Sequence, residues 1–97
     1  MESARSATYH QRADAQLHAL ARALNLYEGF GCSFRDNALH VIRFGAEPGN
    51  ETVTCAPRPS DQDRLWFWAS DRTPIGEADK IQDSALALSA RMPQKRP

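Results

Sequence analysis

The most constraining feature of this sequence is a run of five apolar residues, Leu65 to Ala69, which contains both tryptophans of the chain. A polar loop precedes the run and a Pro-Ile-Gly sequence follows it closely, so the run is too short for a buried helix. Its length and aromatic content are typical of a central β-strand. Successive strand side chains point to opposite faces, which places Leu65, Phe67 and Ala69 on one face. Trp66 and Trp68 fall on the other, so both faces of this strand are apolar.

Two amphipathic helices are predicted, one before and one after the strands. In the first, apolar residues recur every three or four positions from Thr8 onward, which is the period of a helix with one apolar face. This apolar stripe consists of Tyr9, Ala13, Leu17, Leu20, Leu24 and Tyr27. A Gly-Phe-Gly sequence at 29–31 is expected to end the helix. The second helix is predicted from residue 77 or 79 to Arg91. Its apolar stripe consists of Ile81, Ala85, Leu88 and Met92.

Four strands are expected between the helices, at residues 30–35, 38–44, 51–56 and 65–69. The Asp36-Asn37 pair tolerates positive φ and therefore predicts a two-residue turn between the first two strands. The cross-strand pairs that this turn implies are Arg35 with Ala38, Phe34 with Leu39 and Cys32 with Val41. Pro57 and Pro59 should end the third strand, because proline cannot donate a hydrogen bond to a ladder. Ile75 is expected to pack back against the sheet.

The expected fold class is α+β, with the order α-β-β-β-β-α and a four-stranded antiparallel meander whose N- and C-terminal helices lie on one face. The 97 residues are too few for two cores, so residues 1–97 are predicted to form a single domain. Its ordered core is expected at about 8–92, with flexible tails at 1–6 and 93–97. Four strands ~4.8 Å apart form a sheet roughly 19 Å wide, and two helices ~10 Å wide cover one face of it. The second face is left for water or another molecule.

The apolar residues of the sheet are numerous enough to fill both faces. The helix-facing side is expected to carry Phe30, Cys32, Phe34, Leu39, Val41, Leu65 and Phe67. The opposite side then carries Trp66, Trp68, Ile42, Phe44 and His40. Such a surface exceeds the few hundred Å² that soluble monomers usually expose, so we expect an interface with a second copy, as a two-fold homodimer, or with another protein. The alternative is a reversed strand register, or shielding of the indoles by other segments of the chain.

The charge balance and the first residues limit the classes of partner. Twelve basic and twelve acidic residues give a net charge of zero, which argues against binding to nucleic acid or to an anionic membrane. The first residues lack an apolar segment, so we expect no signal peptide and a cytoplasmic location. No apolar run approaches the ~20 residues of a membrane span. The sequence predicts no cofactor.

Few side chains are spaced for chemistry, and each has a simpler interpretation. His10, Asp14 and His18 share a helix face, but a solvated face is preferred over a metal site, and no metal is predicted. His40 could act as a general base in a pocket, although a single histidine in a strand is more typical of a half-exposed sheet position. The two cysteines lie at alternating apolar strand positions and are interpreted as reduced, buried thiols. No catalytic residue is assigned.

Three functions are compatible with these observations. The preferred one is a small non-catalytic interaction module, regulatory or adaptor-like, that self-associates through the face carrying Trp66 and Trp68. The alternative is a small-ligand-binding protein or minor enzyme, in which the tryptophans line an apolar pocket between sheet and helices and His40 or Arg43 is the polar anchor. The third is single-stranded nucleic-acid binding, with bases stacked on rings such as Trp66 and Phe44.

The run Leu-Trp-Phe-Trp followed by Pro-Ile, with a closing helix, is similar to short uncharacterised proteins of high-GC actinomycetes. The similarity covers residues 65–75 and the composition, in which arginine outnumbers lysine ten to two. The family has no established activity, so the resemblance implies a type of genome and assigns no site residue.

Overall fold

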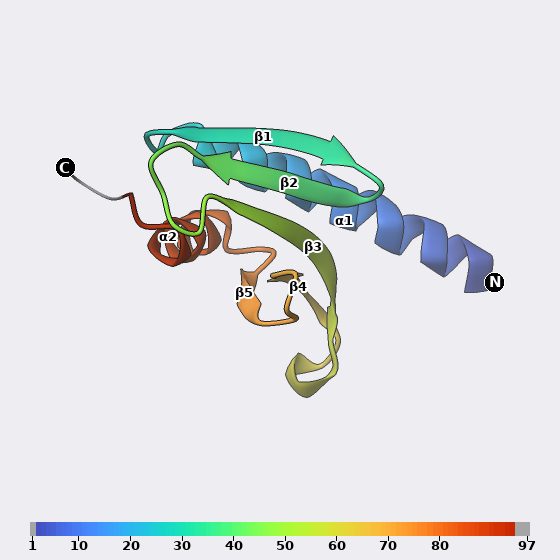
Figure 1. The fold of residues 1–97 in the computed structure, drawn as a ribbon. Helices are drawn as coiled ribbons and strands as arrows, with labels where there is room; N and C mark the ends of the chain where they lie inside the picture. The colour runs from blue at the N-terminus through green and yellow to red at the C-terminus, as the bar shows by residue number, and fades with distance from the viewer. Residues whose placement is uncertain (1, 95–97) are drawn as a thin grey trace.

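Within residues 2–94, which the computed structural model describes with side chains from residue 11 onward, two helices pack on a five-stranded antiparallel sheet (Figure 1). The elements are α1 (Glu2–Leu24), β1 (Phe30–Arg35), β2 (Ala38–Arg43), β3 (Asn50–Arg58), the 3-10 helix η1 (Pro59–Asp61), β4 (Arg64–Trp68), β5 (Pro74–Glu77) and α2 (Ile81–Arg91). The strand order follows the chain, β1-β2-β3-β4-β5, so the predicted α+β meander is confirmed. Neither of these helices is long and apolar enough to cross a membrane.

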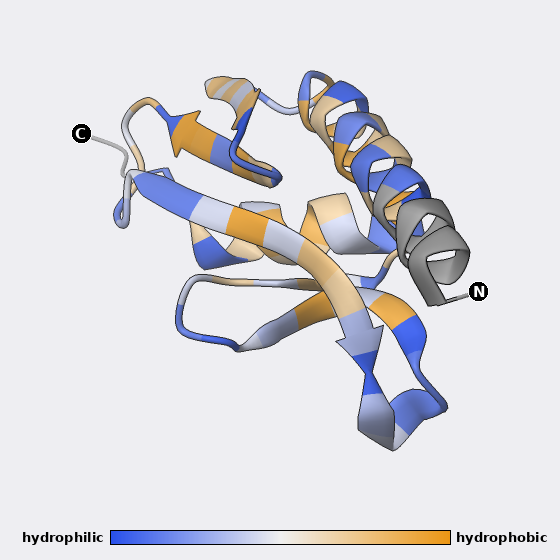
Figure 2. Ribbon diagram, turned by 90° about the vertical axis from the view of Figure 1, so that its right-hand side faces the viewer, coloured by the Kyte–Doolittle hydropathy of each residue, from blue (hydrophilic) through white to orange (hydrophobic). Residues whose placement is uncertain are grey.

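The apolar stripes predicted for both helices face the core. In α1, whose alternating apolar and polar positions are visible in Figure 2, Leu17, Leu20 and Leu24 are at most 1% exposed. In α2, Leu88 is fully buried, and Ile81 packs at the edge of the core. The α1 helix begins at Glu2, earlier than predicted, so the expected tail at 1–6 is helical from residue 2 onward. The Tyr9 side chain and residues 95–97 of the expected C-terminal tail lie outside the described part of the chain.

The first hairpin has the predicted register. Asp36 and Asn37 adopt positive φ angles of 54° and 60°, as a two-residue turn of this kind requires. The β1–β2 pairs include Arg35 with Ala38, Phe34 with Leu39 and Cys32 with Val41. Short-range turn chemistry was therefore sufficient to place these two strands.

The prediction of four strands is wrong, because Ile75 belongs to a fifth strand. β5 pairs with β4 through Trp66 opposite Glu77 and Phe67 opposite Gly76. Gly76 is needed at this position, because a Cβ there would collide with Ser84 of α2, which packs against β5. Because Glu77 belongs to β5, α2 begins later than predicted, at Ile81.

β3 is longer than predicted and serves both halves of the sheet. Its first part, Asn50–Val53, pairs with β2, whereas its second part, Thr54–Arg58, pairs with β4. In Figure 1 this strand bends between the two partners. Pro57 does not end the strand, because its segment has β4 on one side and is not paired with β2 on the other, so a missing N–H breaks no ladder there.

One core lies between the sheet and the helices. Val53 and Phe67 are fully buried from the sheet side, and Leu65 packs against the same cluster. This arrangement confirms the predicted helix-facing side and excludes the reversed register of β4. Cys55 lies on this inner side, where burial raises its pKa to about 12, so the thiol is protonated at neutral pH.

Candidate functional site

The two tryptophans project from β4 onto the outer face of the sheet, the face opposite the helices. Trp66 is paired with Ala56 and Trp68 with Thr54, and both indoles are half-buried. Trp66 Nε1 donates to Asp61 Oδ2 at 2.8 Å, and the Arg58 guanidinium lies 4.3 Å from the centre of the Trp66 ring. Trp66 is thus held on the outer face by contacts within its own hairpin.

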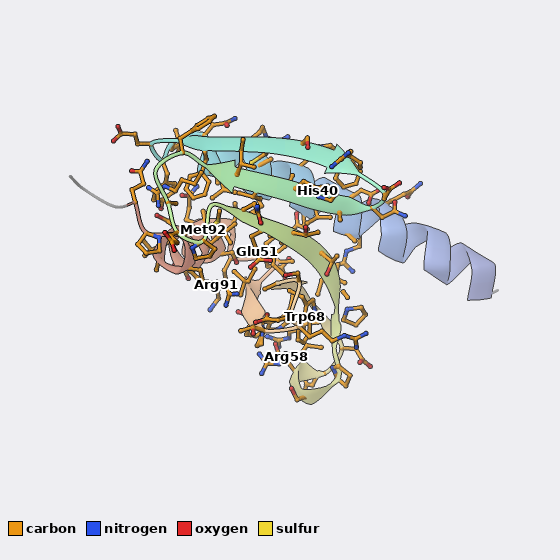
Figure 3. The ribbon with its side chains drawn as sticks, in the orientation of Figure 1. His40, Glu51, Arg58, Trp68, Arg91 and Met92 are labelled. Carbon is orange, nitrogen blue, oxygen red and sulfur yellow. The ribbon has the colours of Figure 1, made fainter. Side chains whose placement is uncertain are left out.

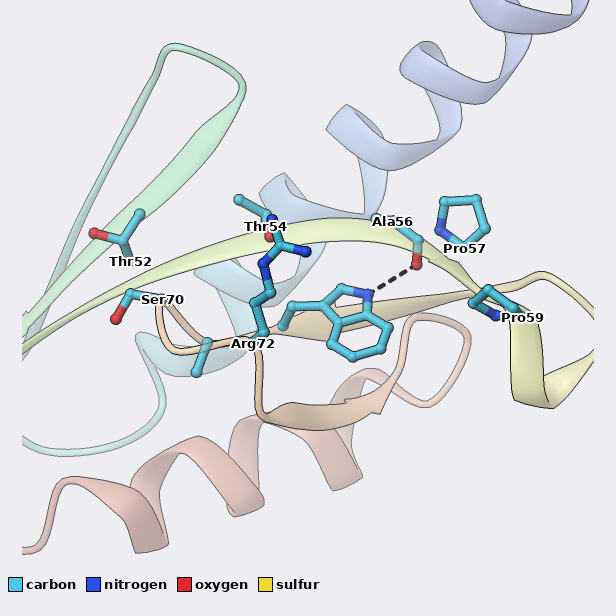
Figure 4. Close-up of a pocket in the computed structure, with 9 residues that line it drawn as sticks. Thr52, Thr54, Ala56, Pro57, Pro59, Ser70 and Arg72 are labelled. Atoms are coloured by element: carbon cyan, nitrogen blue, oxygen red, sulfur yellow. Dashed lines mark hydrogen bonds between the residues drawn. The ribbon is translucent and has the colours of Figure 1, made fainter.

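Trp68 forms one wall of an open hollow of about 650 Å³ on this face, which we call the Trp68 groove. The groove is lined by Thr52, Thr54, Ala56, Pro57 and Pro59 on one side and by Trp68, Ala69, Ser70 and Arg72 on the other. Figure 4 shows Trp68 Nε1 donating to the Ala56 carbonyl, a bond of 3.0 Å. Since this N–H has a partner in the chain, the ring surface is the part of Trp68 that remains for contact with another molecule.

Arg72 reaches the groove from a tight turn between β4 and β5. The turn is closed by Arg72 N donating to Ala69 O and by Ala69 N donating to Thr73 O, both at 2.9 Å. In Figure 4 the Arg72 side chain extends toward the strand that carries Thr54 and Ala56. The side chain is exposed and makes no hydrogen bond or ion pair with any described residue. It therefore adds a positive charge to the groove that no acid of the described residues pairs with.

Glu51 anchors the same turn to β3 and to α2. Its Oε1 accepts hydrogen bonds from Ser70 Oγ at 2.8 Å, Ser70 N at 3.1 Å and Thr52 N at 3.0 Å, and its Oε2 accepts one from Arg91 Nη2 at 3.2 Å. Burial opposes ionisation of this carboxyl, whose side chain is 9% exposed, but the four hydrogen bonds outweigh it and lower the Glu51 pKa. The carboxylate thus fixes one border of the Trp68 groove.

The predicted interface residues of β2 and the turn after it lie on the outer face but do not line the groove. Ile42 is 45% exposed and Phe44, just after β2, is 72% exposed. Ile42 pairs with Asn50 and Trp68 with Thr54, four residues further along β3, which corresponds to about 13 Å along the strand. His40 lies on β2 opposite Thr52, at the border of the groove, but His40 itself does not line the groove and lies away from Trp68 (Figure 3). The five candidates therefore share a face without forming one continuous apolar patch.

Arg43 is engaged in the fold itself and does not line the groove. Its Nη1 donates to Ser89 O, Ser89 Oγ and Met92 O at 3.0–3.2 Å, and its Nε donates to Glu28 O at 3.0 Å. Its guanidinium also lies 4.5 Å from the centre of the Phe30 ring. The groove is not the pocket of the alternative prediction, which placed it between sheet and helices with Arg43 or His40 as anchor, because the groove is on the outer face and neither residue lines it.

Of the helix face predicted to carry His10, Asp14 and His18, the structure describes the last two side chains. The His18 ring packs against Phe34, with ring centres 4.5 Å apart, and the side chain of His10 lies outside the described residues. Among the side chains that the structure describes, no three of the His, Cys, Asp and Glu type are grouped so that they could hold a metal ion.

Sequence reasoning missed Arg72 and the strand residues opposite Trp68. The β3–β4 register that brings Thr54 beside Trp68 depends on a connection through η1, for which the sequence carries no two-residue turn signal. The alternation of threonines in β3 was the available hint, since Thr52 and Thr54 had to share a face. Comparison with known protein families, with curated proteins and with solved structures finds no match to this chain.

Proposed function

We propose that this chain is a small non-catalytic interaction module that binds an extended segment of another protein in the Trp68 groove. The observation that carries the proposal is the groove itself: an open hollow of about 650 Å³ on the helix-free face, walled by an indole whose N–H is already bonded. A volume of this size is within the range of sites that hold ligands of drug-like size, and a short peptide segment is comparable.

The lining residues are suited to recognition. An indole, two prolines and two alanines offer apolar contact, while Thr52, Thr54 and Arg72 offer polar groups at the border. Sites of this kind bind through a few placed polar groups on an otherwise apolar surface. Half-buried tryptophans are favoured at such surfaces because a rigid ring provides large contact area with little loss of conformational entropy.

The bound segment is held by side-chain contacts and not by addition of a strand to β3. The part of β3 that borders the groove contains Pro57, and Pro59 follows in η1, so neither residue can donate a backbone hydrogen bond to an added strand. Strand addition requires a row of such donors and acceptors.

Binding of a different protein is favoured over the homodimer that the sequence suggested. A two-fold interface brings the same patch of both copies together. Arg72 of each copy would then meet a surface that also carries Arg58 and Arg72 of the other. Ile42 and Phe44, which would have enlarged the self-complementary area, lie at the other end of the face.

The test is comparative capture followed by direct titration. We immobilise wild-type protein and two groove variants, Trp68→Ala and Thr54→Tyr, and expose them to lysate of the source organism. Thr54→Tyr fills the groove from an exposed strand position. Leu86→Ala is the matched control, since Leu86 is a 60% exposed apolar residue of α2. We expect a protein that wild type and Leu86→Ala retain and that both groove variants lose, and whose purified form binds wild type in titration.

Circular dichroism and thermal melting of each variant establish that the fold is intact. The proposal fails if the groove variants retain the same proteins as wild type. It also fails if sedimentation at two concentrations shows that the species lost with Trp68 is a second copy of the chain itself.

A further inference from the structure

Arg72 is the available cation of the Trp68 groove. The neighbouring arginines are engaged within the chain: Arg58 stacks on Trp66 and donates to Ser60 Oγ, and Arg64 pairs with Glu77 at 3.5 Å. Arg72 has no such partner among the described residues, and it lines the groove. An arginine in this state offers a planar set of donors that matches a carboxylate.

The carboxylates around the groove do not compensate this charge. Glu51 is held by Ser70, Thr52 and Arg91, and Asp61 accepts the Trp66 N–H. Asp71, the neighbour of Arg72, accepts a hydrogen bond from Thr73 N at 3.1 Å, and hydrogen bonds from Thr73 lower its pKa. Each acid is committed elsewhere, so the Arg72 guanidinium is available to a negative group of a ligand.

The backbone at Arg72 adds an independent observation. Its φ is +67°, in the left-handed region that side chains other than glycine and asparagine rarely adopt. The turn hydrogen bonds hold it there. The turn thus fixes the point beside the groove from which the Arg72 side chain extends.

From this charge complementarity we infer that the segment bound by the groove carries a carboxylate next to a proline or another apolar residue. The carboxylate pairs with the Arg72 guanidinium while the apolar side chain lies on the Trp68 ring, and the Thr52 and Thr54 hydroxyls lie along the same groove. This inference rests on the proposed function and specifies the chemistry of its partner.

A nucleic-acid strand would use the same indole and guanidinium, yet it fits this surface less well. Its phosphates repeat along the chain, whereas the border of the groove also carries the ionised side chain of Asp71, and Asp63 and Asp61 lie in the adjoining loop. The net charge of the chain is zero, so no long-range field attracts a polyanion. A segment with one carboxylate meets fewer of these repulsions than a chain of phosphates.

The experiment is selection of random heptapeptides displayed on phage against the immobilised protein. We expect enriched sequences that contain Asp or Glu beside a proline or apolar residue, and that Trp68→Ala no longer retains. The most enriched peptide and its Asn or Gln counterpart are then titrated by tryptophan fluorescence. We expect about tenfold weaker binding of the amide peptide to wild type, as for loss of a charge-assisted pair.

The Arg72→Gln variant tests the proposed pair between the Arg72 guanidinium and the peptide carboxylate. It should weaken binding of the acidic peptide about tenfold and leave binding of the amide peptide unchanged, whereas Arg22→Gln, the same change at an exposed position of α1, should alter neither. If Trp68-dependent peptides show no preference for acid, or if Arg72→Gln weakens both peptides equally, the inference is overturned and the proposed function stands. If no selected peptide depends on Trp68, both are overturned. Arg72-dependent binding of a labelled (dT)10 strand at low salt, without any acidic peptide, would replace the peptide by a nucleic acid.

Discussion

Glu51, whose side chain is 9% exposed, accepts hydrogen bonds from one strand, one turn and one helix. Its carboxylate accepts four hydrogen bonds in total. Arg91 Nε is buried without a hydrogen-bond partner, so the Arg91 guanidinium depends on Glu51 and on the longer contact with Asp71 at 3.9 Å. We expect Glu51→Gln to lower the free energy of unfolding by about 1–3 kcal/mol, because a neutral amide leaves buried donors unsatisfied. Urea denaturation measures the change. Glu28→Gln, at an exposed position, is the control and should have little effect.

The lowered pKa of Glu51 also predicts a pH dependence. A carboxyl whose folded pKa lies below its unfolded value contributes stability that is fully present above the unfolded value, about 4.3, and is lost as pH falls through the lowered folded value. Melting temperatures recorded from pH 7 to pH 3 should therefore fall more steeply for wild type than for Glu51→Gln below about pH 4.5. Parallel curves for the two proteins would contradict this account of Glu51.

Arg72 and Gln62 share a left-handed backbone, with φ of +67° and +56°, but lie in different surroundings. This conformation is disfavoured by roughly 1–2 kcal/mol for residues with a Cβ, while glycine loses about 0.5–1 kcal/mol more backbone entropy on folding. Glycine at either position should therefore raise the free energy of unfolding slightly, by about 0.5–1 kcal/mol. Only Arg72→Gly should also weaken binding of an acidic peptide. If both variants bind normally, Arg72 has no role in the groove.

At the scale of elements, Arg43 joins the β1–β2 hairpin to the C-terminal end of α2. It donates to Ser89 O, Ser89 Oγ and Met92 O, and so satisfies carbonyls that the last turn of a helix leaves open. Arg43→Met keeps the length of the stem and removes these bonds, and we expect it to destabilise the protein by about 1.5–3 kcal/mol. Amide hydrogen exchange should accelerate most at Leu88–Met92. Arg35→Met, at the exposed end of β1, is the matched control. Equal acceleration of amide exchange in both variants would refute the role of Arg43 in holding the end of α2.

The elements that could be predicted are those whose signals are local. The helix stripes and the Asp36-Asn37 turn each lie within one stretch of sequence, so the sequence alone gave the first hairpin with its register. β5 could not be found this way, since Pro-Ile-Gly-Glu has the composition of a turn and becomes a strand through pairing with β4 and packing under α2. Pro57 was expected to stop β3, and it is tolerated because β2 pairs only with the first part of that strand.

The candidate site was likewise predictable only where its signals are local. The assignment of Trp66 and Trp68 to the helix-free face followed from alternation along one strand, and the structure agrees. The groove beside Trp68 arises from the β3–β4 register and from a turn held by Glu51, which lies nineteen residues from Ser70 in the sequence. Contacts of that separation depend on the whole fold, so Arg72 could not be recognised from its neighbours in the chain.

At the scale of the molecule, the two halves of the sheet share β3 and one core. Val53 and Cys55, next to each other on the inner face of that strand, are buried in the same cluster as the leucines of α1 and α2. A break between the halves would expose this cluster, so they should unfold together as small single domains usually do. Both tryptophans lie on β4 and report only the second half by fluorescence, whereas far-UV circular dichroism reports chiefly the helices.

The denaturation midpoints from these two signals should therefore coincide, for wild type and for a destabilised variant alike. Val53→Ala, at a fully buried position of the shared strand, removes two methyl groups and should lower both midpoints equally, with a loss of about 1–3 kcal/mol. Phe44→Ala, 72% exposed just after β2, is the control and should shift neither midpoint appreciably. If the fluorescence and circular dichroism midpoints separate in Val53→Ala, β3 joins two units that can unfold independently. The Trp68 groove then belongs to the less stable unit if the fluorescence signal changes first, and to the more stable unit if the circular dichroism signal does.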